Sequence, residues 1–349
     1  MSKILFILKR RENYSEKVDT KIGLTTGLYN SASFVNRMLN KVGIKSVMEV
    51  AIDANCIDSL VTKHNPDYVI IEALWVVPSK FSLLCKLHPK VKWIIRIHSE
   101  MPFMAGEGMA MNWIGDYSHF ENISIGVNAP RMLREIRTYL QSVNRWSDNE
   151  TLKKVFYLPN YYPQKFSPPR KIYKTKDYID VGCFGAVRPL KNHMVQAVAA
   201  LDFATQQGKK LRFHINAGRV EMKGQPVLHN LEGFFAHLYS AGHRLIRHEW
   251  STHEEFLHLC SDMDIGMQCN FSETFNIVGA DLISEGIPLV GTTEIPWLSI
   301  GRSNPTDSVD ITKALNRAYN FPAINVRLNQ LSLTKYTNKS AEIWYKRFK

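Results

Sequence analysis

Two acidic residues, Glu273 and Asp281, frame a stretch of the chain that could hold a polar ligand. They are eight positions apart, and residues about two helical turns apart lie near the same helix face. Both carboxylates could therefore reach one ligand. Between them, Phe275, Asn276 and Ile277 form a predicted helix start, whose amide groups favour a phosphate. Spacing alone leaves an ordinary alternative, in which one acid is a solvated loop residue and the other a surface residue.

Three further side chains follow predicted strands in positions that suit ligand binding. Arg188 and Lys191 come after a glycine-containing turn, which follows a strand starting at Ile179. His98 comes at the end of the predicted strand Val91–Ile97. Ligands of open α/β sheets bind outside the carboxyl ends of the strands. Taken singly, each residue could equally be a surface cation or a hydrogen-bonded histidine that binds no ligand.

The elements that would position these residues alternate between apolar strands and helices, which predicts α/β domains built on parallel sheets. In the first part of the chain the predicted strands are Lys3–Leu8, Val47–Ala51, Asp67–Ile71, Val91–Ile97, Ile123–Val127 and Val155–Leu158, and the predicted helices are Ser31–Asn40, Asn55–His64, Ser79–Leu87 and Pro130–Gln141. In the second part the strand that begins at Ile179 is followed by strands Leu211–Ala217, Ile246–Trp250, Ile265–Cys269 and Ile287–Val290, and by helices Met194–Gln206, Glu254–Cys260, Ile277–Glu285 and Asn338–Lys349.

Length and composition describe a globular protein of two ordinary domains. The chain has 349 residues, of which 45% are hydrophobic and 22% charged. No apolar run approaches a membrane span, and the opening segment, residues 1–11, is too short for a signal peptide. The five cysteines are odd in number and scattered. They indicate reduced thiols in the cytoplasm and neither a disulfide framework nor a metal site.

The net charge of +12 is unevenly distributed along the chain. Residues 131–176 contain 11 Lys or Arg and three acids, and residues 313–349 contain eight Lys or Arg and only Glu342. Such segments attract nucleic acid, an anionic membrane or a phosphorylated substrate. A basic protein that is merely soluble is the competing interpretation.

The sequence does not predict a metal site. Residues 214–258 hold seven of the 12 histidines, but none has the spacing of zinc ligands. Asp262 and Asp264 form a D-x-D pattern that joins a predicted helix to a strand, so metal binding there is not expected. The methionine- and glycine-rich segment Met101–Trp113 has three interpretations: an adaptable acceptor loop, a packed insertion or a membrane-touching one.

Residues 271–291 resemble the E-x7-E segment of retaining glycosyltransferases of family 4, which have the GT-B fold. Ser272, Glu273, Phe275, Gly286 and Pro288 fit that pattern. Two positions depart from it: Asn276 replaces the usual glycine, and Asp281 replaces the second glutamate with a shorter side chain. Residues 179–193 resemble the Gly-Arg-x-x-x-x-Lys segment of the same family, with a slightly different turn order.

This resemblance implies an α/β protein of two Rossmann-like domains facing a central cleft. Residues 1–166 would form the acceptor domain, residues 167–337 the nucleotide-sugar domain, and residues 338–349 a helix that crosses back to the first domain. The implied reaction is transfer of a hexose or pentose from a UDP donor with retention, without a bound cofactor or a metal. The resemblance assigns catalytic roles to His98, Arg188, Lys191 and Glu273, and donor binding to Gly23, Gly27, Arg188, Lys191, Thr274, Phe275, Asn276, Ile277 and Asp281.

The expected acceptor depends on the whole-chain pattern and on the basic segments. The whole-chain pattern resembles glycosyltransferases encoded by tailed bacteriophages, some of which modify hydroxymethylated pyrimidines in phage DNA. The basic segments agree with double-stranded DNA, which is bound chiefly through its phosphates. Such an enzyme would flip the base or reach it in the major groove. The alternatives are a glycan or lipid acceptor at an anionic membrane, a nucleotide-sugar epimerase, and a noncatalytic nucleic-acid binder.

Overall fold

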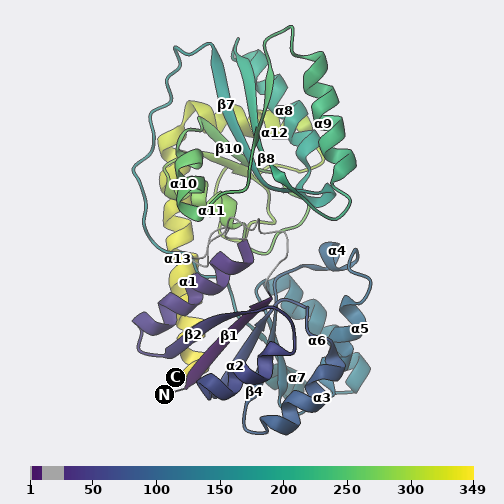
Figure 1. Ribbon diagram of the computed structural model, residues 1–349. Helices are drawn as coiled ribbons and strands as arrows, with labels where there is room; N and C mark the ends of the chain where they lie inside the picture. Colours follow the sequence, from purple (N-terminus) through teal and green to yellow (C-terminus); the bar gives the residue numbers. More distant parts are fainter. Residues whose placement is uncertain (1, 10–26) are drawn as a thin grey trace. The chain divides into compact units, whose positions relative to one another are not determined.

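The computed structural model describes residues 2–9 and 27–349, which form two compact units (Figure 1). Unit 1 comprises residues 2–9, 27–163 and 337–349, and unit 2 comprises residues 164–336. The first boundary thus lies before the predicted position at 166. The segment after this boundary binds unit 2 through its backbone: the Ser167 amide donates to the Ser284 carbonyl (2.7 Å) and the Arg170 amide to the Gly286 carbonyl (2.9 Å).

Unit 1 is built on a six-stranded sheet with the order β2-β1-β3-β4-β5-β6, in which every neighbouring pair is parallel. The strands are β1 (Lys3–Lys9), β2 (Lys45–Ala51), β3 (Tyr68–Glu72), β4 (Lys92–Ile97), β5 (Ile123–Val127) and β6 (Val155–Tyr157). The helices are α1 (Gly27–Lys41), α2 (Cys56–His64), α3 (Pro78–Leu87), α4 (Met101–Met104), α5 (Ala110–Ser118), α6 (Pro130–Asn144) and α7 (Asp148–Lys154).

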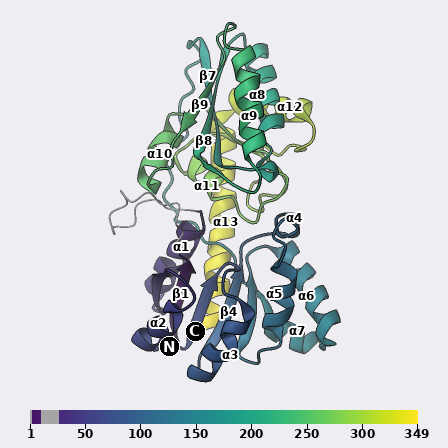
Figure 2. The ribbon, with the colours of Figure 1, turned by 45° about the vertical axis from the view of Figure 1, so that its right-hand side comes forward.

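Apolar residues on both faces of the unit 1 strands explain why the sheet is covered on both sides. On β1, Leu5 and Ile7 join a core with α2, α3, α5 and α6, whereas Ile4 and Phe6 join a core with α1 and the end of α13 (Pro322–Phe348). Parallel strands buried on both faces carry such near-continuous apolar runs. Figure 2 shows α1 on one side of the unit 1 sheet and α5 and α6 on the other side.

Unit 2 is built on a five-stranded parallel sheet with the order β11-β10-β7-β8-β9. Helices α8, α9 and α12 share the main apolar core, and α10 and α11 cover the other face (Figure 2). The strands are β7 (Tyr178–Val187), β8 (Lys210–Val220), β9 (Arg244–His248), β10 (Ile265–Gln268) and β11 (Leu289–Gly291). The helices are η1 (Pro189–Lys191), α8 (His193–Gln206), α9 (Gln225–His237), α10 (His253–Ser261), α11 (Ile277–Ser284) and α12 (Ser308–Asn320).

The structure distinguishes among the three interpretations of one segment and lengthens a second one beyond its predicted bounds. The methionine-rich segment folds into α4 and α5, with Met104 and Ile114 buried, so it is a packed insertion. The predicted last helix, Asn338–Lys349, is the end of the continuous helix α13, which spans 27 residues. After Pro322 at its first position, this segment contains neither glycine nor proline, and nothing in its sequence ends the helix earlier. No helix in the described part of the chain is both long and apolar enough to cross a bilayer.

Candidate active site

Lys191 and Glu273 form an ion pair beyond the carboxyl ends of strands β7 and β10. The Lys191 ammonium donates to Glu273 Oε1, and each side chain is only 11% exposed. Asn270 Nδ2 donates to the same carboxylate oxygen at 2.8 Å. The sequence predicted both charged residues but not their contact. The pair places a cation at the edge of the sheet where ligands of this architecture bind.

Buried amide side chains hold the loop that carries Glu273. Gln268 Nε2 donates to the Phe184 carbonyl at 2.9 Å, which ties the end of β10 to β7. Gln268 Oε1 in turn accepts from Asn276 at 2.9 Å and from Asn270 at 3.3 Å. Because these buried polar groups form hydrogen bonds with one another, they hold the loop in one conformation. The backbone position from which the Glu273 side chain extends is therefore fixed.

Asn276 is the N-cap of α11, and its backbone conformation explains why it can stand where the resembled pattern has glycine. Its φ of 66° lies in the left-handed region, which Gly and Asn adopt most readily. Its Oδ1 accepts from the Gly279 amide at 2.6 Å and so satisfies one of the unpaired amides of the helix start. Phe275 anchors the other side of the turn: its carbonyl accepts from Trp297 Nε1 at 2.6 Å, and its ring packs near Tyr336.

Replacing Asn276 with alanine is therefore expected to lower the free energy of unfolding by about 2 kcal/mol. Losing the cap costs about 1 kcal/mol, and holding alanine in the left-handed region costs about 1 kcal/mol more. Asn276→Gly removes the cap without the backbone penalty, so it should cost less. Urea unfolding of the three proteins measures the difference, and equal stability of the two variants would contradict this account of the turn.

Arg188 lies on the same turn as Lys191 but meets a different acid. It is the N-cap of η1, and its Nη1 lies 3.5 Å from Glu221 Oε2. Glu221 also pairs with Arg219, whose guanidinium lies 5.1 Å from the centre of the Trp250 ring. Arg188 is about one-fifth exposed at 21%. The two cations that the sequence predicted together are thus held by separate counterions.

Sequence reasoning missed His193, which directly follows this turn at the start of α8. The side chain is buried, and both ring nitrogens lack a hydrogen-bond partner among the described residues. Burial, together with the charges of Lys191 and Arg188, lowers the pKa of His193 to about 3. The ring is therefore neutral at physiological pH and adds a polar group, without charge, beside the two cations.

Asp281 is not the surface residue that spacing alone suggested, and it does not share a helix face with Glu273. Only residues 277–284 are helical, so the two-turn argument does not apply to Glu273, which lies in the preceding loop. Asp281 is 1% exposed, and its Oδ1 lies 2.9 Å from Nε2 of His253 at the start of α10. Nothing in the sequence indicates that His253 lies beside it.

His98 lies at the end of β4 in unit 1, where both ring nitrogens are engaged. Nε2 bonds Glu72 Oε2, and Nδ1 lies 3.2 Å from Asn128 Nδ2. Burial and the charge of Arg96 lower the pKa of His98, so the ring is neutral. It then donates from Nε2 to Glu72 and accepts from Asn128 through Nδ1. A ligand could bond the ring through nitrogen only by displacing one of these partners.

The remaining predicted site residues are placed as follows. Gly27 is the first residue of α1, and Gly23 lies outside the described residues. Thr274 and Ile277 are partly buried on either side of the α11 cap. Within residues 2–9 and 27–349 no group of three or more potential ligands could hold a metal ion. Asp264 instead accepts from the Asp180 amide at 3.0 Å.

Comparison with known proteins identifies the fold. No family model and no curated protein matches the sequence. Solved structures do match it over almost the whole chain. Sucrose-phosphate synthase from Thermosynechococcus elongatus has a TM-score of 0.67 at 14% identity, covering 100% of this chain and 98% of that one. The trehalose-6-phosphate synthase OtsA has a TM-score of 0.71 at 12% identity, covering 99% of both chains. The E. coli trehalose-6-phosphate structure bound with UDP-2-fluoro glucose has a TM-score of 0.69 at 11% identity, covering 99% of both.

These neighbours and the two parallel α/β sheets define the GT-B fold, which confirms the predicted fold class. The neighbours are trehalose-phosphate and sucrose-phosphate synthases. The likeness to family 4 and to bacteriophage enzymes stays a prediction from the sequence.

Proposed function

We propose that the protein is a retaining glycosyltransferase that moves a hexose from a UDP-sugar to an acceptor hydroxyl. The observation that carries this proposal is the nearly buried Lys191–Glu273 pair at the carboxyl ends of β7 and β10. The structural neighbours support it, since one is described as UDP-forming and another holds UDP-2-fluoro glucose.

The chemical task in unit 2 is to stabilise negative charge on the leaving diphosphate. Lys191 supplies a cation, and Glu273 is its counterion. Arg188 would leave Glu221 to reach the phosphates, and the first amides of α11 would donate to them. Glu273, held by Asn270, would then bind hydroxyl groups of the donor sugar.

Two further roles complete the proposal. Asp281 would bind the ribose, either after release from His253 or together with it. In unit 1, His98 would contact the sugar or acceptor by exchanging its bond from Asn128 for one to a hydroxyl group. No covalent nucleophile is assigned. Retention then proceeds on one face of the sugar, with the leaving phosphate helping to deprotonate the acceptor.

For the acceptor we propose a hydroxymethylated pyrimidine in double-stranded DNA. The support is the net charge of +12 and the exposed cations around α6, such as Arg134 and Arg145. Two other arginines of this segment serve the fold: Arg131 pairs with Glu100, and Arg137 donates to the Val155 carbonyl at 2.8 and 2.9 Å. A glycan or lipid acceptor is the second candidate, favoured by the exposed apolar residues of α13.

The test is a donor and acceptor panel. UDP release from several UDP-sugars is measured with hydroxymethylated DNA, unmodified DNA, oligosaccharides and lipid vesicles, before and after chelation. We expect transfer that survives chelation and is greatest with the modified DNA. Transfer only to lipid or glycan would overturn the DNA acceptor and leave the donor proposal intact. Conversion of the UDP-sugar without any transfer would indicate an epimerase and overturn the transferase proposal.

A further inference from the structure

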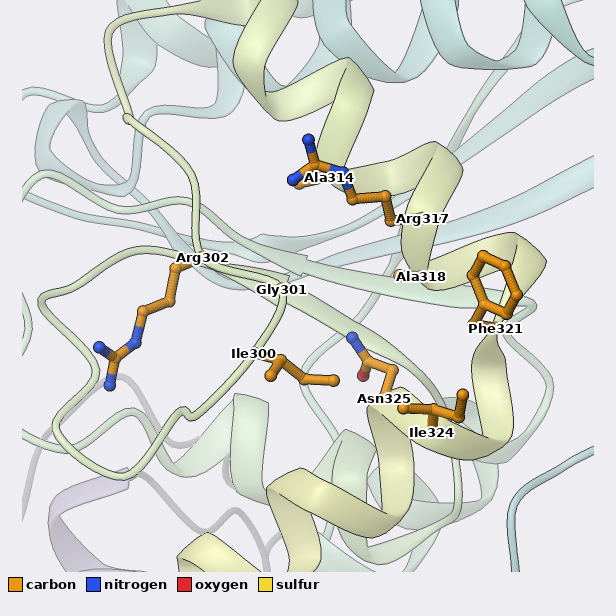
Figure 3. Close-up of a pocket in the computed structure, with 9 residues that line it drawn as sticks. All are labelled: Ile300, Gly301, Arg302, Ala314, Arg317, Ala318, Phe321, Ile324 and Asn325. Carbon is orange, nitrogen blue, oxygen red and sulfur yellow. The ribbon is translucent and has the colours of Figure 1, made fainter.

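A cavity of about 440 Å³ lies in unit 2, away from the residues of the proposed donor site (Figure 3). Helix α12, the first turn of α13 and the loop at 300–302 enclose it. Most of its lining is apolar and comes from Ile300, Ala314, Ala318, Phe321 and Ile324. The cavity therefore suits an apolar group that enters from solvent.

One cation is available beside this cavity. Arg317 is exposed, and its side chain has no hydrogen-bond or ion-pair partner in the part of the chain that the structure describes. Arg302, in contrast, donates to the Leu298 carbonyl, and Figure 3 shows its guanidinium turned away from the cavity. The Asn325 side chain is bonded to the Leu289 backbone: its Oδ1 accepts from the Leu289 amide at 2.9 Å, and its Nδ2 donates to the Leu289 carbonyl at 3.1 Å. Arg317 is thus the polar group that could meet an anionic ligand head.

An exposed apolar stripe runs from the cavity along α13. Its members are Phe321, Ile324, Leu328 and Leu331, which are 61, 54, 42 and 60% exposed. Ile324, Leu328 and Leu331 are spaced by four and three positions, so they lie on one side of α13, and Phe321 directly precedes this helix at the end of α12. Exposed apolar residues that are scattered singly are normal, whereas a contiguous set indicates an interaction surface.

Cations flank the stripe, and acids are absent from it. Arg327 and Lys335 are exposed on the same side of α13 and have no ion-pair partner among the residues described. No Asp or Glu occurs between Asp310 and Glu342. The stripe, the cavity and the three cations Arg317, Arg327 and Lys335 are here called the α13 face.

We propose that the α13 face docks on an anionic phospholipid bilayer. The stripe would lie at the acyl boundary, the cations would meet the headgroup phosphates, and the cavity would accept an acyl chain end beside Arg317. Nucleic acid binding would engage the cations but leave the apolar side chains in water. A protein partner would need roughly 800 Å² of matched surface on each side, whereas four partly exposed side chains supply much less.

Docking is tested without the transfer reaction, so its failure and that of the proposed function are distinguishable. The protein is floated with vesicles of phosphatidylcholine alone or mixed with phosphatidylglycerol. Binding is expected only with the anionic mixture. The variant with Ile324→Ser and Leu331→Ser should bind about tenfold more weakly or worse. The variant with Arg317→Gln and Arg327→Gln should lose the preference for anionic vesicles.

Matched controls come from other surfaces of unit 2. Val198→Ser removes an exposed apolar side chain of α8, and Arg247→Gln removes an exposed cation of β9. Both should bind vesicles as the parent protein does. All variants change exposed side chains, so thermal melting should be unaltered. Equal vesicle binding by the stripe variant and Val198→Ser would overturn the proposal, as would no binding to anionic vesicles. A concentration-dependent dimer that the stripe variant abolishes, seen by light scattering, would also overturn it and assign the face to a second copy.

Discussion

Replacing Lys191 with alanine is expected to slow sugar transfer about 10²- to 10³-fold. The ammonium group would stabilise charge that grows on the leaving diphosphate, and this stabilisation is greatest in the transition state. Lys191 is already fixed in place by Glu273, so it costs little reorganisation when the donor binds. UDP release under saturating donor measures the rate. The effect should appear mainly in kcat, because the charge develops during the reaction.

The control for this prediction must separate chemistry from folding. Lys191→Ala leaves the Glu273 carboxylate nearly buried without its counterion, which destabilises the protein by itself. The double variant Lys191→Met with Glu273→Gln removes both charges and should recover most of the stability but none of the activity. Lys313→Ala, at an exposed position of α12, should keep both the stability and the activity of the parent protein. Normal turnover by a folded Lys191→Ala protein would rule out its role at the diphosphate.

The sheets could be predicted because their strands are short apolar runs between polar turns. β1 is an example: its central residues, Ile4 to Leu8, are all buried, and the sequence shows them as an unbroken apolar run. The start of α13 could not be predicted in this way. Ile324, Leu328 and Leu331 lie on its exposed side, so the usual pattern of apolar residues facing the core is weakened there.

The contacts of the candidate site depend on sheet order, which the sequence does not specify. Lys191 and Glu273 are 82 positions apart and meet because β7 and β10 are neighbours in the sheet. The pairing of Asp281 with His253 similarly requires that α10 pack beside α11. Family resemblance could identify Glu273 but not its partner. Glu72 and Arg96, in unit 1, lie inside apolar strands. Their burial as a pair can be predicted only when it is known which strands are neighbours in the sheet.

Replacing Arg96 with methionine is expected to lower the free energy of unfolding by about 3–5 kcal/mol at neutral pH. Arg96 and Glu72 are both fully buried, with Nη1 at 3.1 and 3.3 Å from the two carboxylate oxygens. The guanidinium also donates to the carbonyls of Leu158 (3.2 Å) and Pro159 (3.1 Å) and lies 5.1 Å from the centre of the Trp344 ring. Methionine keeps the volume but leaves Glu72 as a buried charge without this counterion. Urea unfolding followed by circular dichroism measures the loss.

The loss should shrink as the pH falls. Burial alone would raise the pKa of Glu72, but the charge of Arg96 and the hydrogen bonds from Arg96 and His98 lower it below its ordinary value of 4.5. In the parent protein this carboxylate therefore adds stability above about pH 4.5, and that part is lost as the pH falls through the lowered pKa. In the variant, burial without Arg96 makes protonation of Glu72 favourable, and His98 can take up a proton and pair with it. Acid thus removes the unpaired charge from the variant while it weakens the parent.

Adding Glu72→Gln to Arg96→Met should restore part of the stability and flatten the pH dependence of the difference. A difference that does not change between neutral and acid pH would contradict the ionised Glu72–Arg96 pair.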